Sequence, residues 1–431
     1  MELQTIAGKS LDDYYSSPEG RSGGEDEVIK AEKWGISPYE IEETIYYFGK
    51  HLALPGIAGV LIPLTIIFGI FDNSLIAILS YIIYALAAIL LLSVGRELIR
   101  GWRYKIKEGA IYLPGPYYFR REAEDYTPRI NEISKPKYKI GFVGDIMKMN
   151  DFDLEFHPDI KKFFEDTDLI IGNLEGIIKK PCPRLKQAHK DDILEKLESL
   201  LSDNTKWLLC LSNNHGEDFS NTLFNQTIQT IQENPKFDVF GRREISFIQN
   251  ATKDLTIACA TQWSNQKTWN YTFKYTNPEI EINNYVNNPK YPFLLIQNNK
   301  FNILLPHWGF ENEKYVRTRF QKDAKALLTG KLPDYKGFKK IYKRKLLKGI
   351  FAHPNHKWDL IFAHHPHVLQ PIMMVPDEFK PTEGKSISFN KVVVFSAGNF
   401  TSGANIIRKK KHISGIIIKC EIGPLKECKE K

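Results

Sequence analysis

The sequence contains few cysteines, and their spacing argues against two common kinds of stabilised domain. Only five occur among 431 residues, and no two of them form a Cys-x-x-Cys pair. An odd number of widely spaced cysteines is unlike either a disulfide framework or a thiolate zinc site. We interpret all five as scattered reduced thiols that face a reducing compartment: Cys182, Cys210, Cys259, Cys420 and Cys428.

No residue type dominates the composition, which excludes several classes of protein. Glycine (28 residues) and proline (23 residues) are too few and too irregular for a collagen-like or low-complexity chain. The hydrophobic content of 42% is enough for a packed core, and the length suits one large domain or two ordinary ones. The formal net charge of +8 favours anionic partners without choosing between lipid, phosphate and nucleic acid.

Two adjacent runs lack charged residues entirely, namely Leu52–Phe71 and Leu75–Val94. Each has 20 residues, and at about 1.5 Å per helical residue this length spans a hydrocarbon core of about 30 Å. Because Asp72, Asn73 and Ser74 alone separate the runs, we predict a transmembrane helical hairpin. Two buried core helices are the alternative. A cleavable signal peptide is not expected, because the first run is too long and too far from Met1.

The basic residues around the two runs predict the orientation of the hairpin. Lys30, Lys33 and Lys50 precede it, a cluster from Arg96 to Lys107 follows it, and the turn has neither Lys nor Arg. Basic flanks prefer the cytoplasmic side of a membrane. We therefore expect a multi-pass membrane protein with two helices and its main domain in the cytoplasm.

The rest of the chain divides into segments of different character. Residues 1–51 are polar and partly disordered in appearance, and residues 95–137 form a basic linker. From residue 138 to 431, short runs rich in Val, Ile, Leu and Phe alternate with helical stretches such as Asp192–Ser202. Buried strands separated by helices predict an α/β domain.

A strongly basic insert interrupts this domain at Lys331–Lys348, where eight Lys and Arg residues face Asp334 alone. A solvated surface is one interpretation. The other is contact with anionic lipid headgroups, worth about 1 kcal/mol per basic residue near a membrane. Nucleic acid is an unlikely partner, because no recognised binding module accompanies the insert.

Polar, metal-capable side chains follow strand after strand in the predicted domain. Ligands bind at the carboxyl ends of strands in open α/β sheets, so these side chains are expected to gather at one site. The mixture of carboxylate, amide and imidazole suits one or two divalent ions of Mn, Fe, Zn or Mg. In an extended His-Pro-His segment, the first and third side chains point to the same side. The strand-end set is Asp145, Glu175, Asn213, Asn214, His215, His307, His364, His365 and His367.

Six short motifs occur in a fixed order between Tyr138 and Lys419, about two thirds of the chain: GD at Gly144, NLE at Asn173, NNH at Asn213, HWGxE at His307, HHPHVLQ at His364 and SxGNF at Ser396. This set resembles the CapA family of capsule or poly-γ-glutamate synthesis proteins, within the calcineurin-like metallophosphatase superfamily. The resemblance implies a two-sheet β-sandwich flanked by helices (αββα), here preceded by the transmembrane hairpin.

The resemblance also implies a role for each residue. Asp145 and His367 would bind a first metal ion, and Glu175 would bridge it to a second ion held by Asn214, His307 and His365. His215 would be the catalytic histidine. Asp218 and Glu311 match family positions and would orient imidazoles. Asn399, in a turn, would touch substrate or serve the turn alone. Asn213 and His364 would also orient ligands or touch substrate.

One position departs from the metallophosphatase pattern. Typical members carry a histidine two residues after the first aspartate, and this chain has Met147 there. The first metal would then have only Asp145, Glu175 and His367. The expected function is a membrane-anchored, metal-dependent hydrolase acting on a phosphoester or a related bond in capsule or polymer metabolism. The alternative is a non-catalytic, accessory membrane subunit that works with partner proteins in the synthesis or export of such a polymer.

Overall fold

The fold is taken from a computed structural model of the chain. It describes residues 2–7, 110–112, 128–150, 152–179, 186–265, 271–272, 300–313, 316–330, 357–379, 386–403 and 414–426. These ranges belong to one compact unit, made of Met1–Tyr14 and Ile106–Lys431. The predicted hairpin at Leu52–Val94 and the basic insert at Lys331–Lys348 lie outside the described residues. Within the described ranges, no helix is long and apolar enough to cross a membrane.

The apolar runs that the sequence marks as strands are strands in the structure. This confirms the predicted α/β class, since helices lie between several of them. Eight of the described strands correspond to these apolar runs: β3 (Tyr138–Ile146), β4 (Leu169–Leu174), β7 (Lys206–Cys210), β8 (Phe237–Phe240), β10 (Leu255–Thr261), β11 (Phe301–His307), β12 (Leu360–Phe362) and β14 (Ile387–Val394).

The first seven-stranded sheet has the order β1-β16-β3-β4-β7-β8, with β15 also paired to β3. Strands β3, β4, β7 and β8 run parallel, so their carboxyl ends meet at one edge. The added strands are β1 (Glu2–Ala7), β15 (Asn399–Thr401) and β16 (Ser414–Ile422). Strand β16 is antiparallel to both of its neighbours, β1 and β3.

The second seven-stranded sheet has the order β2-β13-β14-β12-β11-β10-β9. Its four central strands, β10, β11, β12 and β14, are parallel, and antiparallel strands extend both sides. These flanking strands are β2 (Ala110–Tyr112), β9 (Ile248–Thr252) and β13 (Ile372–Phe379). A small separate pair, β5 (Ile177–Ile178) and β6 (Ala188–His189), follows β4 in the chain.

The two large sheets pack face to face. Phe142 of β3 stacks on Phe362 of β12, with ring centroids 4.9 Å apart. Cys210 of β7 lies against Cys259 of β10, and burial together with that contact raises the pKa of the Cys259 thiol. Both cysteines and Cys420 are free thiols, as the sequence predicts. These contacts between the sheets are therefore made by aromatic rings and thiols.

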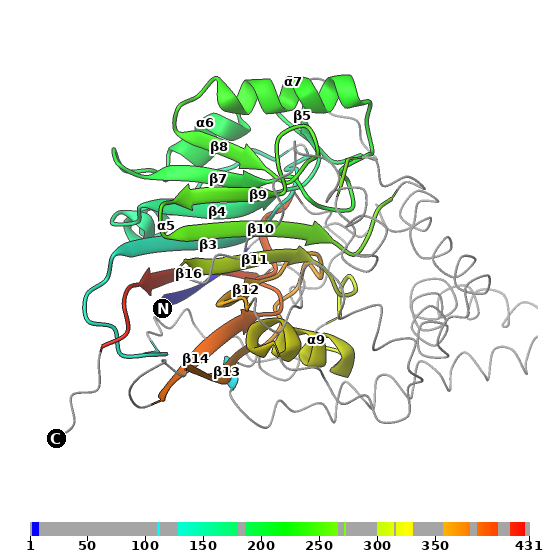
Figure 1. The fold of residues 1–431 in the computed structure, drawn as a ribbon. Helices are drawn as coiled ribbons and strands as arrows, with labels where there is room; N and C mark the ends of the chain where they lie inside the picture. Colours follow the sequence, from blue (N-terminus) through cyan, green and yellow to red (C-terminus); the bar gives the residue numbers. More distant parts are fainter. Residues whose placement is uncertain are drawn as a thin grey trace, which may run out of the picture. The chain divides into compact units, whose positions relative to one another are not determined.

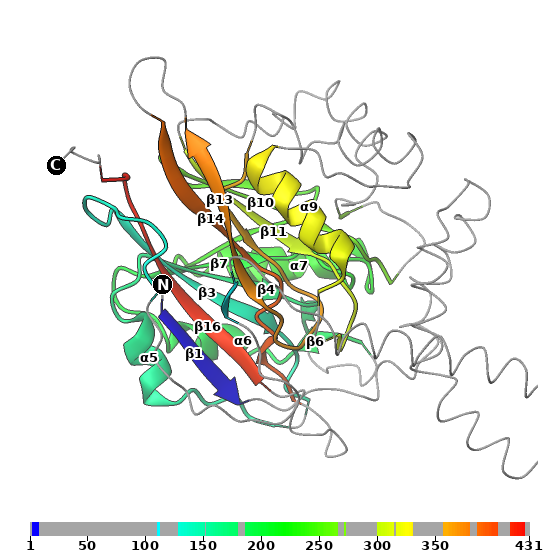
Figure 2. The same ribbon diagram turned by 90° about the horizontal axis from the view of Figure 1, so that it is seen from below.

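Helices cover the outer faces of both sheets. On the first sheet lie α5 (Pro158–Phe164), α6 (Ile193–Glu198) and α7 (Asn221–Gln232). On the second lies α9 (Thr318–Thr329), which contacts β12, β13 and β14. Figure 1 shows α7 beside the first sheet, and Figure 2 shows α9 beside β13 and β14. The layers thus follow the order helices, sheet, sheet, helix.

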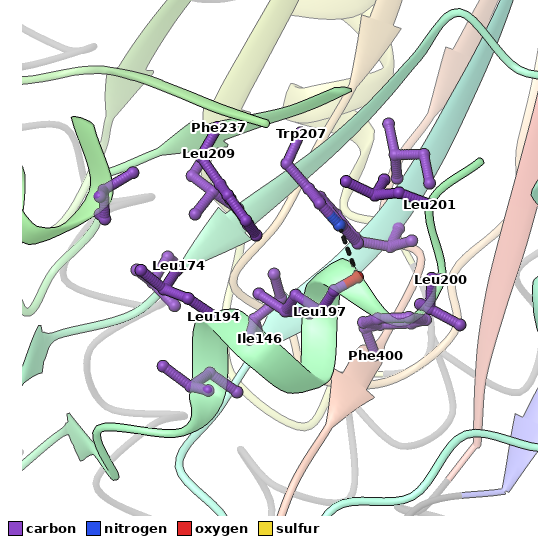
Figure 3. Packing of buried hydrophobic residues seen from close by; sticks show 14 of the residues in the cluster. Ile146, Leu174, Leu194, Leu197, Leu200, Leu201, Trp207, Leu209, Phe237 and Phe400 are labelled. Atoms are coloured by element: carbon purple, nitrogen blue, oxygen red, sulfur yellow. Dashed lines mark hydrogen bonds between the residues drawn. The ribbon is translucent and has the colours of Figure 1, made fainter. Parts of the chain in front are cut away.

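The core under α6 illustrates how this layering is held (Figure 3). Leu194 and Leu197 of α6 pack on Trp207 and Leu209, the outward-facing residues of β7. The Trp207 indole N–H donates a hydrogen bond to the carbonyl of Leu197 at 2.9 Å, so the buried ring has no unmet donor. The alternation of β7 residues leaves Leu208 and Cys210 for the inter-sheet layer.

Candidate metal centre

The twelve residues that the sequence predicts for the site gather where the two sheets meet, at the carboxyl ends of their parallel strands. Asp145 lies near the end of β3, Glu175 directly follows β4, and Asn214 and His215 follow β7. His307 ends β11, and the His-Pro-His segment follows β12. All twelve side chains belong to residues that are at most 6% exposed. The predicted convergence of distant strand ends is therefore present.

Asp145, Glu175 and His367 form one buried group that could hold a metal ion. A ligand atom of each lies within 4.8 Å of the others. The Nδ1 atom of His367 is 3.1 Å from the Oδ2 atom of Asp145. The Oε2 atom of Glu175 is buried and receives no hydrogen bond from any described residue. An unmatched buried carboxylate oxygen is costly, and a cation would satisfy it.

A second set of ligand atoms converges on the other side of Glu175. The Nε2 atom of His307 is 3.0 Å from Asn214 Oδ1, 3.0 Å from His365 Nδ1 and 3.8 Å from Glu175 Oε1. Donor atoms about 2.1 Å from a shared ion lie about 3.0–3.4 Å from one another in octahedral or tetrahedral arrangements. The 3.0 Å distances to Asn214 and His365 match this spacing, whereas Glu175 Oε1, at 3.8 Å, lies beyond it.

A third buried group that could hold an ion consists of Glu311, His365 and His367, whose ligand atoms also lie within 4.8 Å of one another. Met147 belongs to none of these groups of His, Asp and Glu among the described residues. Its thioether side chain is buried at 2% exposure, and its backbone pairs with Thr401 through hydrogen bonds at 3.1 and 2.9 Å. The structure thus places no imidazole at the position where the metallophosphatase pattern has one.

Burial divides the site into ionised and neutral groups. Burial alone would raise the pKa of Asp145, but hydrogen bonds from His364 and His367 outweigh it and hold that pKa well below its ordinary value. Burial raises the pKa of Glu175 well above its ordinary value. Burial also lowers the pKa of His307 and His365, which favours neutral imidazoles able to bind a metal.

His367 is the exception among these imidazoles. Burial would lower its pKa, but the charge of Glu175, the hydrogen bond and charge of Asp145 and the charge of Glu311 raise it to about 9. In the metal-free chain at neutral pH, His367 is therefore a cation that balances the carboxylates. A metal ion at this position must displace that proton.

We expect the apparent metal affinity to rise with pH. Below pH 9, the raised pKa of His367 means that protons compete with the metal, and one displaced proton changes affinity about tenfold per pH unit. Glu175, with its raised pKa, acts in the same direction. Titration calorimetry with Mn²⁺ at several pH values, in buffers of different ionisation enthalpy, counts the released protons. A Mn²⁺ affinity that is the same at all of these pH values contradicts the expectation.

His215 lies beside the metal-binding groups and is held by an acidic partner. Its Nδ1 atom is 2.6 Å from Asp218 Oδ2, and its Nε2 atom is 3.7 Å from Glu175 Oε2. With Nδ1 turned to Asp218, Nε2 is the nitrogen that lies nearer the Glu175 carboxylate. Asp218 therefore contacts an imidazole, which is the position expected of a residue that orients one.

The His-Pro-His segment reaches the site by a different route from the one predicted. His365 and His367 have positive φ angles of 96° and 55°, so the segment is not extended. The prediction that an extended segment would point both imidazoles to the same side is therefore wrong in its geometry. Their rings nonetheless lie 5.9 Å apart, because two left-handed residues turn the chain back toward the site. Such conformations are unfavourable for residues with a Cβ atom and tend to persist at functional sites.

Asn399 also differs from its prediction. It begins strand β15 and pairs with Asp145 of β3, so it is not in a turn. Its Oδ1 atom is 2.9 Å from Nδ1 of His367, which places it against a metal-binding candidate. His364 lies behind Asp145, with its Nδ1 atom 3.3 Å from Asp145 Oδ1. Asn213 links the loop after β7 to the end of β4 by donating to Leu174 O and Asn173 Oδ1.

Two asparagines at the site were not among the predicted residues. Asn173 donates to Asp145 Oδ1 at 2.8 Å and to Glu175 Oε1 at 3.2 Å, so it holds both carboxylates. Its place in the Asn-Leu-Glu motif is the signal that pointed to it. Asn265 follows β10 and carries no motif, so only the fold brings it to Asn214 and His215.

Asn265 connects the metal-binding side of the site to the His215 pair. Its Oδ1 atom accepts a hydrogen bond from Asn214 Nδ2 at 3.1 Å, which turns the Asn214 oxygen toward His307. Its Nδ2 atom donates to Asp218 Oδ1 at 3.3 Å. A single amide therefore orients a candidate metal ligand and the carboxylate that holds His215.

Substitution of Asn265 should separate these two contacts. Asn265→Ala removes both, and we expect about 10-fold weaker Mn²⁺ binding, typical of a lost ligand-orienting contact. Asn265→Asp keeps the acceptor for Asn214, so metal affinity should stay near wild type while the added charge beside Asp218 changes the pH profile of turnover. Calorimetry and the pH profile of turnover measure the two effects. Equal metal affinity in wild type and Asn265→Ala would show that the amide does not orient Asn214.

The chain matches no protein-family model and no curated protein. The geometry of the site therefore carries the evidence on its function. That geometry contains buried groups of His, Asp and Glu that could hold a metal ion. The donor set of carboxylates, an amide and imidazoles fits such an ion without any thiolate.

Proposed function

We propose that this chain is a divalent-metal-dependent hydrolase of the CapA-like metallophosphatase type, which acts on a phosphoester or a related bond. The observation that carries the proposal is the convergence of six candidate ligands from five parallel strands on one buried place: Asp145, Glu175, Asn214, His307, His365 and His367. The layer order of helices, two facing sheets and a helix supports the metallophosphatase-like sandwich that the sequence resemblance implies.

The ligand spacing supports two adjacent positions for Mn, Fe, Zn or Mg ions that share Glu175. Asp145 and His367 would hold the first ion, and Asn214, His307 and His365 the second. Ions bound there supply Lewis-acid activation of water and of a phosphoryl oxygen. The protein itself contributes a dry, rigid setting, because every ligand candidate is buried and hydrogen-bonded to a neighbour.

His215 is the proposed proton donor to the leaving oxygen. Asp218 holds its Nδ1 side at 2.6 Å, which leaves Nε2 to donate toward the centre. The Asp218 carboxylate also stabilises the imidazolium that must form before the proton is given up. Glu175, 3.7 Å from Nε2, marks the side on which substrate would lie.

We also propose, on sequence grounds, that the uncharged runs Leu52–Phe71 and Leu75–Val94 anchor this domain on the cytoplasmic face of a membrane. The basic insert Lys331–Lys348 would then contact anionic headgroups. Capsule or poly-γ-glutamate metabolism, with its synthesis proteins as partners, is the setting that the resemblance to the CapA family suggests. All three sequence segments lie outside the described residues.

The test uses the purified full-length chain. We expect bound Mn, Fe or Zn by elemental analysis, and turnover of a generic phosphomonoester or phosphodiester that stops after chelation and returns when metal is added. A chain that binds none of these ions and cleaves neither ester would reject the proposal. The two ester classes also show which bond the site prefers.

The absence of an imidazole at Met147 favours a second candidate function, an accessory subunit of a polymer synthesis or export machine that binds metal weakly and catalyses nothing. It predicts that His215→Ala leaves polymer formation in cells intact, whereas deletion of Leu52–Val94 abolishes it. Loss of polymer in the His215→Ala strain would favour the hydrolase instead.

A further inference from the structure

We infer that Glu311 is itself a metal ligand and replaces the imidazole that is missing at Met147, so that the centre is built on three carboxylates. This inference rests on the proposed metal centre and extends it by naming a ligand and a class of ion. The carboxylate of Glu311 groups with His365 and His367, within 4.8 Å of a ligand atom of each. His367 belongs to the proposed first position and His365 to the second.

The loop after β11 holds Glu311 in this place. The main-chain N–H of Trp308 donates to His364 O at 3.1 Å, and that of Asn312 donates to Pro366 O at 2.8 Å. These two hydrogen bonds, one on each side of Glu311, tie its loop to the His-Pro-His segment. Gly309 and Asn312 have positive φ angles of 90° and 61°, which give the loop its reversals.

Side chains next to Glu311 fasten the same loop to the fold. The Arg317 guanidinium lies 3.7 Å from the centroid of the Phe310 ring and donates to both carboxylate oxygens of Glu313 at 2.9 and 2.6 Å. Gln370 donates to the Glu313 carbonyl at 2.7 Å. The Glu311 carboxylate is therefore carried by a rigid loop, at 6% exposure, and is preorganised for an ion.

Electrostatics agree with this position. Burial lowers the pKa of His367, whereas Glu175, Asp145 and, more weakly, Glu311 raise it. Glu311 also adds to the effect of burial in raising the pKa of Glu175. Its negative charge thus acts on two of the three members of the first group, Glu175 and His367. Three carboxylates in one buried centre need cationic compensation, which divalent ions supply.

The ligand set indicates which ions the centre prefers. Asp145, Glu175 and Glu311 would supply carboxylate oxygens, Asn214 an amide oxygen, and three histidines nitrogens. Carboxylate and carbonyl ligands suit Mg and Mn, whereas imidazole-rich and thiolate-rich sites suit Zn. Replacing an expected imidazole by Glu311 therefore shifts the preference toward Mn over Zn.

The experiment compares the full-length wild type with Glu311→Gln, Glu311→His and Glu313→Gln. The probes are Mn²⁺, Zn²⁺ and Co²⁺ alone, and the visible absorption of bound Co²⁺ reports its ligands. We expect Glu311→Gln to change this spectrum and to bind Mn²⁺ at least about 10-fold more weakly. Glu311→His, which restores the missing imidazole, should favour Zn²⁺ over Mn²⁺ relative to wild type.

Glu313→Gln is the matched control, because it alters a buried carboxylate of the same loop that is bound by Arg317. It should lower thermal stability and leave the Co²⁺ spectrum unchanged. A Glu311→Gln variant with the wild-type Co²⁺ spectrum would overturn the inference, even if its affinity fell, since that pattern fits an orienting residue. A wild type that binds no metal would instead reject the proposed function.

Discussion

Replacing His215 with glutamine should lower the turnover number by about 10²–10⁴-fold, the usual contribution of a positioned general acid. The metal content should stay that of the wild type, because His215 is not among the proposed ligands. Glutamine keeps a polar side chain of similar size but cannot give up a proton at neutral pH. The imidazole that it removes lies between Asp218, at 2.6 Å, and Glu175, at 3.7 Å.

The same substitution at His189 is a matched control for the His215 experiment. His189 is equally buried, and its Nε2 atom lies 2.8 Å from the Glu175 carbonyl oxygen. Burial lowers the pKa of His189 to about 4, so it stays neutral and takes no part in proton transfer at neutral pH. His189→Gln should retain turnover within a few-fold. A His215→Gln variant with wild-type turnover at equal metal content would contradict the assignment of the proton donor.

Replacing Asp145 with alanine should abolish metal binding at the first position and lower the free energy of unfolding of the metal-free chain by about 3–5 kcal/mol, as for other broken buried ion pairs. Both oxygens of Asp145 are engaged. The Oδ1 atom accepts from Asn173 at 2.8 Å, and the Oδ2 atom accepts from the main-chain N–H of His365 at 3.2 Å. His367, a buried cation, lies 3.1 Å from Oδ2.

The pH dependence of this loss identifies its cause. The folded-state pKa of His367, about 9, lies above the unfolded value, so its pairing stabilises the fold fully at low pH and is lost as pH rises through 9. The destabilisation by Asp145→Ala should therefore be larger at about pH 6 than at about pH 9.5. Urea unfolding with a chelator present measures it. If Asp145→Ala lowers the free energy of unfolding equally at both pH values, the lost hydrogen bonds of Asp145 alone explain the effect.

Much of the candidate site could be predicted from the order of residues along the chain. Parallel strands place their carboxyl ends together, so the polar residues that follow β3, β4 and β7 meet at one edge of the first sheet, and those that follow β11 and β12 meet at one edge of the second. The packing of the two sheets then brings these two sets together. The apolar runs before Asp145, Glu175 and His307 are long enough to identify as buried strands. For this reason the sequence alone indicates the metal-capable residues.

Other features depended on contacts that no local pattern encodes. The positive φ angles of His365 and His367 arise from a loop fastened to Trp308 and Asn312, far away in the sequence. Asn399 belongs to a strand because β15 adds to β3 beside Asp145, although its sequence resembles a turn. Asn265 reaches Asn214 only because the second sheet faces the first.

The sequence by itself determined the fold class, the strands and the chemical types of the site residues. The reason is that the apolar pattern of each strand and the polar residues that follow it are local in the sequence. The tertiary structure alone decided which nitrogen faces which oxygen, and it placed Glu311 within reach of His365 and His367. The physical reason is that hydrogen bonds and metal ligation depend on atom positions within a fraction of an ångström. Such precision comes from packing between elements that are distant along the chain.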